Sequence, residues 1–448
     1  MSNGALIGEV LGLFFAGIIA DKYGFKKTML GALAMLTCFI FIVFFAQNLP
    51  MLLAGEILCG LPWGVFQTLT TTYAAEVCPT ALRAYLTTYV NLCWVFGQFL
   101  SSGVLKGVSG RTDAFAYKLP FALQWMWPVP LIIGIAFAPE SPWWLVRKGR
   151  TEDAKEVLVR LTSSKVENFN ADETVAMMTH TNEFEKSQSE GTSYWDCFKG
   201  TDLRRTEIVC CVWAVQTLCG ATFMGYSTYF YQQAGLDVSD SFSLSLGQYA
   251  LGAVGTMSSW FLMAKFGRRT LYLSGQAIMF TLLLITGLLG IIPAGNTGAQ
   301  WAIGSMLLAY TFAYDATVGP VCYSLVAELS STRLRQKTVV LARNFYNIMG
   351  IMTNILTPRM LNPSAWGWGA KSALFWSGLC AVCFLWTFFR LPEPKGRTYA
   401  ELDMLFETKT SARKFSSTAV DPFATTVTHT CGEKSGTVRI EQVSSNTS

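Results

Sequence analysis

The sequence predicts an all-α membrane protein built from two pseudo-symmetric helical bundles, and three observations predict this fold class. Apolar residues make up 51% of the 448 residues and charged residues only 14%, against about 25% charged residues in ordinary globular proteins. The apolar residues gather into eleven stretches long enough for membrane-spanning helices. Short sequence marks of the first half recur in the second half in the same order.

The apolar stretches predict helices rather than membrane strands. None of them shows the alternation of a membrane strand, and a backbone in lipid must satisfy its own hydrogen bonds, which favours helices. The expected spans are residues 2–20, 29–46, 50–75, 84–107, 119–139, 207–230, 241–263, 270–292, 300–327, 338–358 and 372–390. Residues 1–20 differ from a cleaved signal peptide, because they lack a positive leader and contain Glu9.

Composition also excludes other classes of protein. The net charge of +5 does not indicate a nucleic-acid partner, and the 12 cysteines are scattered rather than arranged as a secreted disulfide framework. The sequence contains no P-loop, metal-ligand cluster or catalytic triad. We therefore expect no enzyme activity, no metal and no cofactor, and the oligomeric state stays open.

Basic residues in the loops predict the orientation of the chain. One set of loops is much richer in Lys and Arg than the opposite set, whose basic residues are Lys106, Arg111, Lys118, Arg359 and Lys371. The basic set and the C-terminal tail are therefore expected in the cytoplasm. Eleven crossings then place Met1 outside, so either a helix upstream is missing from the sequence or the first helix inserts unusually.

The two halves of the chain carry matching marks, which indicate a duplicated bundle joined by a cytoplasmic linker, a transporter architecture. The pairs are Asp21–Lys27 and Ala264–Arg269, Glu76 with Arg83 and Glu328 with Arg335, and Pro139-Glu140 and Pro392-Glu393. The expected division is an N-terminal bundle of five spans (1–139), a linker with short helices such as 151–161 (140–206), a C-terminal bundle of six spans (207–390) and a mostly disordered cytoplasmic tail (391–448).

Charged residues at the inner helix ends predict a cytoplasmic gate. Acids and bases there could pair across the interface between the bundles and hold the inner side shut; alternatively, they only orient the loops. The gate candidates are Asp21, Lys26, Glu76, Arg83, Glu140, Arg268, Glu328, Arg335 and Glu393.

Several motifs resemble the sugar porter branch of the major facilitator superfamily, and most narrowly the fungal maltose and general α-glucoside permeases. They are the loop Asp21–Lys27, Leu61-Pro62-Trp63-Gly64, Tyr85–Tyr89, Leu119–Trp125, Pro139–Leu145 and Pro392–Gly396. The resemblance covers roughly residues 1–406. It implies a major facilitator fold that lacks the first of its twelve helices, and proton-coupled uptake of an α-glucoside through the plasma membrane by alternating access.

The resemblance also implies a sugar site made of amide, hydroxyl and aromatic side chains inside the spans. The matching positions are Asn91, Gln98, Gln216, Thr222, Tyr226, Gly319, Tyr323, Tyr346 and Asn347. The alternative is that these residues form hydrogen bonds between helices. Two positions depart from the family, because Glu56 stands where most sugar porters have Arg and Tyr323 stands where they have Trp.

Ionisable residues inside predicted spans are candidates for proton coupling, because a charge in the bilayer is costly. They are Glu9, Glu56, Asp315 and Arg343. We expect Glu9 or Asp315 to act as the counter-ion of Arg343 and to take up and release a proton. The alternative is a static buried ion pair.

Two other functions remain open from the sequence. The first is a carrier of the same fold with a different cargo, such as a glycosylated or secondary metabolite, which could be exported. The second is a sugar receptor that does not transport, or an inactive truncated permease. The expected partners in the leading interpretation are a small sugar, protons and the lipid bilayer.

Overall fold

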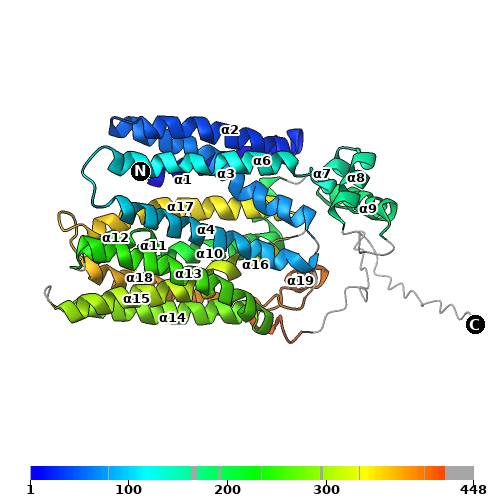
Figure 1. The fold of residues 1–448 in the computed structure, drawn as a ribbon. Helices are drawn as coiled ribbons and strands as arrows, with labels where there is room; N and C mark the ends of the chain where they lie inside the picture. Colours follow the sequence, from blue (N-terminus) through cyan, green and yellow to red (C-terminus); the bar gives the residue numbers. More distant parts are fainter. Residues whose placement is uncertain are drawn as a thin grey trace, which may run out of the picture.

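The computed structural model describes residues 2–78, 80–162, 169–189, 193–233, 235–292, 296–331, 333–397 and 399–418. All regular secondary structure in these residues is helical, as the sequence predicts. Figure 1 shows the long helices lying side by side in two groups, with α7–α9 and α19 together at one end of the bundle.

The N-terminal half contains four long helices and one broken helix. They are α1 (Ser2–Tyr23), α2 (Phe25–Phe44), α3 (Leu49–Val77), α4 (Thr80–Val108), and α5 (Phe115–Leu123), η1 (Gln124–Met126) and α6 (Pro128–Phe137). The Asn48 side chain caps α3 by accepting a hydrogen bond from the backbone N–H of Met51 at 3.0 Å. Hydropathy predicts one continuous span over 119–139, but this helix is interrupted at η1, just before Pro128.

Glycines allow α1 and α3 to pack closely. A Cβ atom at Gly8 or Gly12 would overlap backbone carbonyl oxygens of α3, and one at Gly60 or Gly64 would overlap those of α1. Small residues one turn apart on facing helices are the usual means by which membrane helices approach. This packing places Glu9 of α1 directly against α3.

The linker folds into short helices, most of which form a small subdomain at the end of the N-terminal half. Its helices are α7 (Pro142–Arg147), α8 (Thr151–Leu161), α9 (Ala171–Ser189) and the 3₁₀ helix η2 (Tyr194–Phe198). The predicted helix 151–161 is confirmed. Trp144, Leu158 and Met178 of three linker helices pack with Ala20 and Phe25 of the N-terminal half in one apolar cluster. Helices α7–α9 are therefore attached to the first bundle, whereas η2 packs against α10 and α17 of the C-terminal half.

The C-terminal half contains six long helices, some of them interrupted. They are α10 (Gly200–Gln216) with η3 (Thr217–Ala221), α11 (Thr222–Gly225) and α12 (Ser227–Gln233), then α13 (Val238–Lys265), α14 (Arg268–Leu289), α15 (Thr297–Ala316) with α16 (Val318–Leu329), α17 (Arg335–Leu361), and η4 (Gly369–Lys371) with α18 (Ser372–Arg390). Gly220, at a φ of 92°, interrupts the first of these, and Thr317 separates α15 from α16. Both breaks lie near the middle of the bundle.

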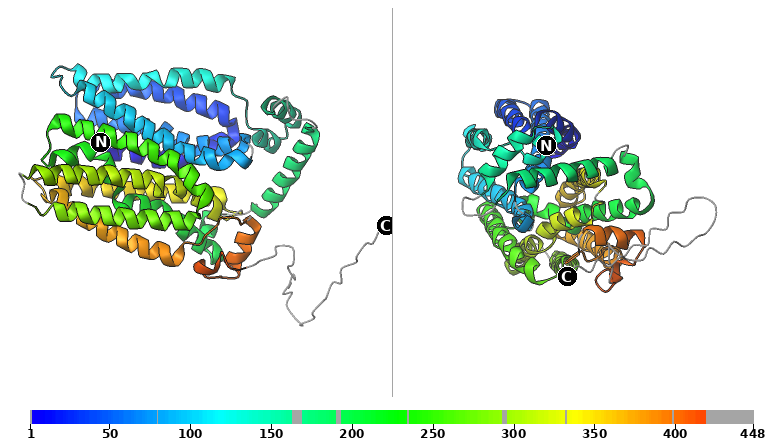
Figure 2. Two further views of the ribbon diagram at one scale, coloured as in Figure 1. Left: turned by 60° about the horizontal axis from the view of Figure 1, so that its bottom comes forward. Right: turned by 90° about the vertical axis from the view of Figure 1, so that its right-hand side faces the viewer.

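Two interfaces join the halves. Helix α1 packs against α17, and α4 packs against α13 and α16. Figure 2 shows the two groups of helices from two further directions. Residues on these five contact helices are therefore the ones whose neighbours change when one half moves relative to the other.

Seven helices among the described residues are long and apolar enough to cross a membrane. They are Asn3–Tyr23, Phe25–Phe44, Leu49–Ala74, Phe115–Phe137, Gly200–Gly225, Arg268–Leu289 and Gly369–Arg390. The other four expected spans, 84–107, 241–263, 300–327 and 338–358, correspond to α4, α13, α15–α16 and α17, and stay a prediction. Helices α4, α13, α16 and α17 make most of the contacts between the halves. Their polar residues therefore have neighbours other than lipid.

The beginning of the expected disordered tail is ordered, which corrects that prediction for residues 399–418. Helix α19 (Tyr399–Glu407) is followed by η5 (Ala412–Lys414), and Leu405, Phe406 and Phe415 are fully buried. A few large apolar side chains were enough to dock a segment whose average composition is polar. Residues 419–448 lie outside the described residues.

Candidate functional site

A chain of hydrogen bonds joins the two halves in the middle of the bundle. The Gln67 side-chain amide donates to Glu9 Oε2 at 2.8 Å, and Arg343 Nε donates to Gln67 Oε1 at 2.8 Å. Glu9 and Gln67 lie on α1 and α3 of one half, and Arg343 lies on α17 of the other. Of the two predicted counter-ions, Glu9 is thus the one linked to Arg343, through an amide that we did not predict. The signal for Gln67 was available, because it is an amide within the expected span 50–75.

Aromatic rings surround the other side of the Arg343 guanidinium. Its carbon lies 4.5 Å from the centre of the Trp213 ring and 4.6 Å from that of Tyr346. The Trp213 ring meets those of Tyr323 and Tyr346 edge to face, at centroid distances of 5.0 and 5.3 Å. This group, which we call the aromatic box (Trp213, Tyr323 and Tyr346), includes two predicted sugar-site residues. Trp213 was not predicted.

A second polar cluster lies at the other interface between the halves. The Asn91 amide on α4 donates to Asp315 Oδ1 of α15 and to Thr256 Oγ1 of α13, both at 3.1 Å. All three side chains are buried. A Cβ atom at Gly319 would lie 3.2 Å from Asn91 Oδ1, so this predicted position also borders the cluster. Asp315 is therefore held by Asn91, and the expected pairing of Asp315 with Arg343 does not appear among the contacts of the described residues.

Several buried polar atoms near these clusters have no hydrogen-bond partner among the described residues. Both side-chain polar atoms of Asn344 and Asn347, Nε2 of Gln216, Oγ1 of Thr222 and Nε1 of Trp213 are in this state. Gln216 Oε1, in contrast, accepts a hydrogen bond from Tyr314 at 2.8 Å. Leaving a buried polar group unpaired costs about 1–3 kcal/mol. Such groups on neighbouring helices are suited to a hydroxyl-rich ligand or to water.

Of three further predicted residues, two lie apart from these clusters. Gln98 is exposed on α4, and the structure does not bring it to Asn91, seven residues away. Glu56 is half-buried near the start of α3, roughly 16 Å along the helix from Gln67. Tyr226 packs against the apolar core of the C-terminal half. Helical periodicity alone did not distinguish these positions from the interior ones.

The inner ends of the two halves use the same carboxylate arrangement. Glu140 accepts hydrogen bonds from the backbone N–H groups of Phe25 and Lys26 at the start of α2, at 3.0 and 3.2 Å. Glu393 does the same for Arg268 and Arg269 at the start of α14, at 2.8 and 3.0 Å. A carboxylate at a helix N-terminus satisfies free N–H groups and opposes the helix dipole.

A glycine lets each of these carboxylates lie close to the backbone. A Cβ atom at Gly24 or Gly267 would overlap the carboxylate of Glu140 or Glu393, and Gly24 also has a φ of 93°. The repeated glycine and the repeated glutamate are thus two parts of one structure. This contact, rather than the freedom of the turn alone, explains why the sequence marks recur together.

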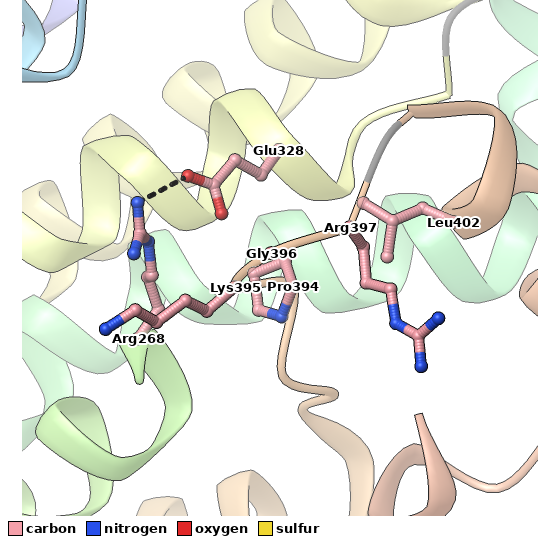
Figure 3. A pocket seen from close by; sticks show the side chains of 7 residues that line it. All are labelled: Arg268, Glu328, Pro394, Lys395, Gly396, Arg397 and Leu402. Atoms are coloured by element: carbon pink, nitrogen blue, oxygen red, sulfur yellow. Dashed lines mark ion pairs between the residues drawn. The ribbon is translucent and has the colours of Figure 1, made fainter. Parts of the chain in front are cut away.

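Ion pairs of the gate residues lie within each half. Arg147 pairs with Glu76 at 2.9 Å, and Arg268 pairs with Glu328 at 3.3 Å. Figure 3 shows the second pair beside a pocket of about 430 Å³ that Lys395 also lines. We expected pairing across the interface between the halves. Each of these two pairs instead joins residues at the inner end of its own half.

The other gate candidates have varied positions. Lys26 Nζ donates to the carbonyl oxygen of Ala136 at 2.6 Å, and the carbonyl oxygen of Asp21 accepts a hydrogen bond from Trp144 at 3.1 Å. Arg335 begins α17. The side chain of Arg83 lies outside the described residues.

Comparison with known proteins identifies the family. The family of sugar (and other) transporters matches residues 1–406. The chain belongs to this sugar transporter family. The general alpha-glucoside permease of Saccharomyces cerevisiae is 46% identical over 424 residues, which cover 93% of this chain and 68% of that protein. The maltose permease MAL31 of the same yeast is 45% identical, over 94% of this chain and 69% of that protein.

Solved structures of the major facilitator superfamily share the fold. The proton:xylose symporter XylE bound to 6-bromo-6-deoxy-D-glucose superposes with a TM-score of 0.74 at 20% sequence identity, covering 90% of this chain and 88% of that one. The inward-open form of the E. coli xylose transporter XylE gives 0.68. The sugar transporter described here is therefore a multi-pass membrane protein of the major facilitator fold.

Proposed function

We propose that this chain carries maltose or a related α-glucoside across the plasma membrane together with protons, by alternating access between the two halves. The observation that carries the proposal is the 46% identity to a general alpha-glucoside permease over nearly the whole chain. The basic loops support a cytoplasmic C-terminus. The same bias supports a cytoplasmic position for the carboxylate-capped helix ends.

The sugar would bind between the aromatic box and the unpartnered amides. Asn347 and Gln216 offer free donors, and Asn347 also a free acceptor, to sugar hydroxyls. The rings of the aromatic box provide apolar faces on which a pyranose can stack. The other proposed contacts are Asn91, Thr222, Tyr226 and Gly319. Gln98 is the weakest of the original candidates, because it lies away from the buried amides.

Proton coupling would run through the chain from Glu9 to Arg343. When Glu9 is ionised, the Gln67 amide donates to its carboxylate and accepts a hydrogen bond from the guanidinium of the opposite half. A proton on Glu9 removes that charge and weakens the link between the halves, which favours their movement. Normal proton-coupled uptake by both Glu9→Gln and Arg343→Ala would exclude this role.

Uptake of labelled maltose in yeast cells that lack α-glucoside permeases tests the proposal. We expect uptake that a protonophore abolishes. Asn347→Ala should raise the KM about tenfold or more, because it removes two polar atoms from the site. Ser258→Ala is the matched control, since this half-buried serine bonds the carbonyl oxygen of Val254 in its own helix. No uptake by a chain shown to reach the plasma membrane would refute the proposal.

A further inference from the structure

The segment after α18 is attached firmly to the inner end of the C-terminal half. We call residues 399–418 the tail clamp. Its main attachment is Arg205 near the start of α10, which is 3% exposed. Arg205 donates to the carbonyl oxygens of Leu329 and Ser330, at 2.9 and 3.0 Å, and forms an ion pair with Asp403 of α19. One side chain therefore ties α10, the end of α16 and the tail clamp together.

Aromatic residues and a second arginine complete the attachment. The rings of Phe406 and Phe415 meet edge to face at 5.0 Å, and the Arg204 guanidinium lies over both, at 5.4 and 5.9 Å. From the loop before α19, Arg397 donates to the carbonyl oxygens of Phe415, Ser416 and Thr418, at 3.1, 3.4 and 2.7 Å. The turn 415–418 is thus held by buried rings on one side and by Arg397 on the other.

Ser416 is exposed at the surface of this turn. Arg413 and Lys414 precede it by three and two residues, and both are also exposed. The Arg413 guanidinium lies over the rings of Phe388 and Phe389 of α18, at 4.3 and 4.7 Å. Basic residues just before a serine match the acidic substrate clefts by which some protein kinases select their targets.

We propose that Ser416 is a phosphorylation site for a kinase of this basic-directed class, and that its phosphate closes the tail clamp more tightly. In the reaction, Ser416 Oγ attacks the γ-phosphorus of ATP. A new O–P bond forms, the bond to ADP breaks, and the hydroxyl proton passes to the kinase. The proposal rests on the cytoplasmic orientation of the tail proposed above, because ATP and kinases are found on that side.

The surroundings of Ser416 favour a bound phosphate. Arg397 already contacts its carbonyl oxygen, so one guanidinium group lies close to the new charge. Phosphate carries about −1.5 to −2 charges at neutral pH, and such a group placed opposite arginines orders the segment that bears it. Because Arg205 ties the clamp to α10 and α16, a tighter clamp also stiffens the inner ends of both helices.

Phosphorylation of the purified full chain in lipid nanodiscs tests the proposal. The probe is the catalytic subunit of cyclic-AMP-dependent protein kinase with ATP, and the sites are mapped by mass spectrometry. We expect phosphate on Ser416 in the native chain and in the Ser417→Ala control, and none on the clamp of Ser416→Ala. Phosphate on Ser417 instead, or nowhere in the clamp of a folded chain, would overturn the proposal.

Hydrogen–deuterium exchange of residues 402–418 measures the effect on the clamp. Phosphorylation should slow exchange in this segment about tenfold, and Arg397→Gln should still accept phosphate but lose most of that protection. Unchanged or faster exchange after phosphorylation would refute a tighter clamp. The test uses no sugar, so a failure of α-glucoside uptake leaves its result intact. Labelling of Ser416 in intact cells tests the orientation separately.

Discussion

Replacing Gln67 with leucine removes the link between Glu9 and Arg343 without removing either charge. Leucine is similar in size to glutamine, but it can neither donate to Glu9 nor accept from Arg343. Each hydrogen bond to an ionised group contributes about 1.5–3 kcal/mol. Only the bond from Arg343 to Gln67 crosses the interface of α1 and α3 with α17, so this link supplies about 1.5–3 kcal/mol there.

This range corresponds to a change of roughly tenfold to a hundredfold in the equilibrium between the present arrangement and one in which the halves have moved apart. We expect Gln67→Leu to lose the proton uptake that accompanies maltose addition, while maltose still moves down its concentration gradient. The assay follows the external pH of a weakly buffered cell suspension together with labelled maltose.

Thr70→Ala is the matched control for this substitution. Thr70 lies on α3 about one turn after Gln67, is exposed, and only bonds the carbonyl oxygen of Phe66 in its own helix. Its removal should leave both proton and sugar uptake unchanged. If Gln67→Leu takes up protons and maltose in the native ratio, the link through this amide has no part in coupling.

Two further substitutions test the packing and the helix capping. Gly60→Leu should prevent accumulation of folded protein, because its side chain would overlap the backbone of α1 at Ala5, whereas Gly31→Leu has open space and should not; equal amounts of both in fluorescence-detected size-exclusion chromatography would contradict the close packing. Glu393→Gln should lower the thermal midpoint, since it removes about 1–2 kcal/mol of interaction with the start of α14; the exposed Glu156→Gln is the control, and equal midpoints would contradict the capping role.

Hydropathy predicted most of the helices but not their interruptions. The apolar stretch 270–292 matches α14 closely, because an uninterrupted apolar helix needs only its own side chains to be specified. The breaks at Gly220 and Thr317 follow from contacts with neighbouring helices. A Cβ atom at Gly220 would press on Leu283 and Trp376 of two other helices, and no pattern along the chain records such contacts.

Site residues could be predicted as polar exceptions within apolar spans, but their partners could not. Glu9, Asn91 and Arg343 were all identified in this way. The pairing of Asn91 with Asp315 depends on the relative height of two helices from different halves, which a single sequence does not specify. Trp213 was missed because a tryptophan in an apolar span is ordinary, and its role follows only from the guanidinium beside it.

The two interfaces between the halves share a chemical solution. At each of them a neutral amide, Gln67 or Asn91, hydrogen-bonds a buried carboxylate, Glu9 or Asp315. Breaking a buried ion pair leaves an uncompensated charge and costs about 3–5 kcal/mol. An amide can donate to the ionised acid and accept from the protonated one. Glu9 and Gln67 lie in the same half, so Glu9 keeps this partner in both charge states when the halves separate. Asn91 and Asp315 lie in opposite halves, so their bond breaks in that movement.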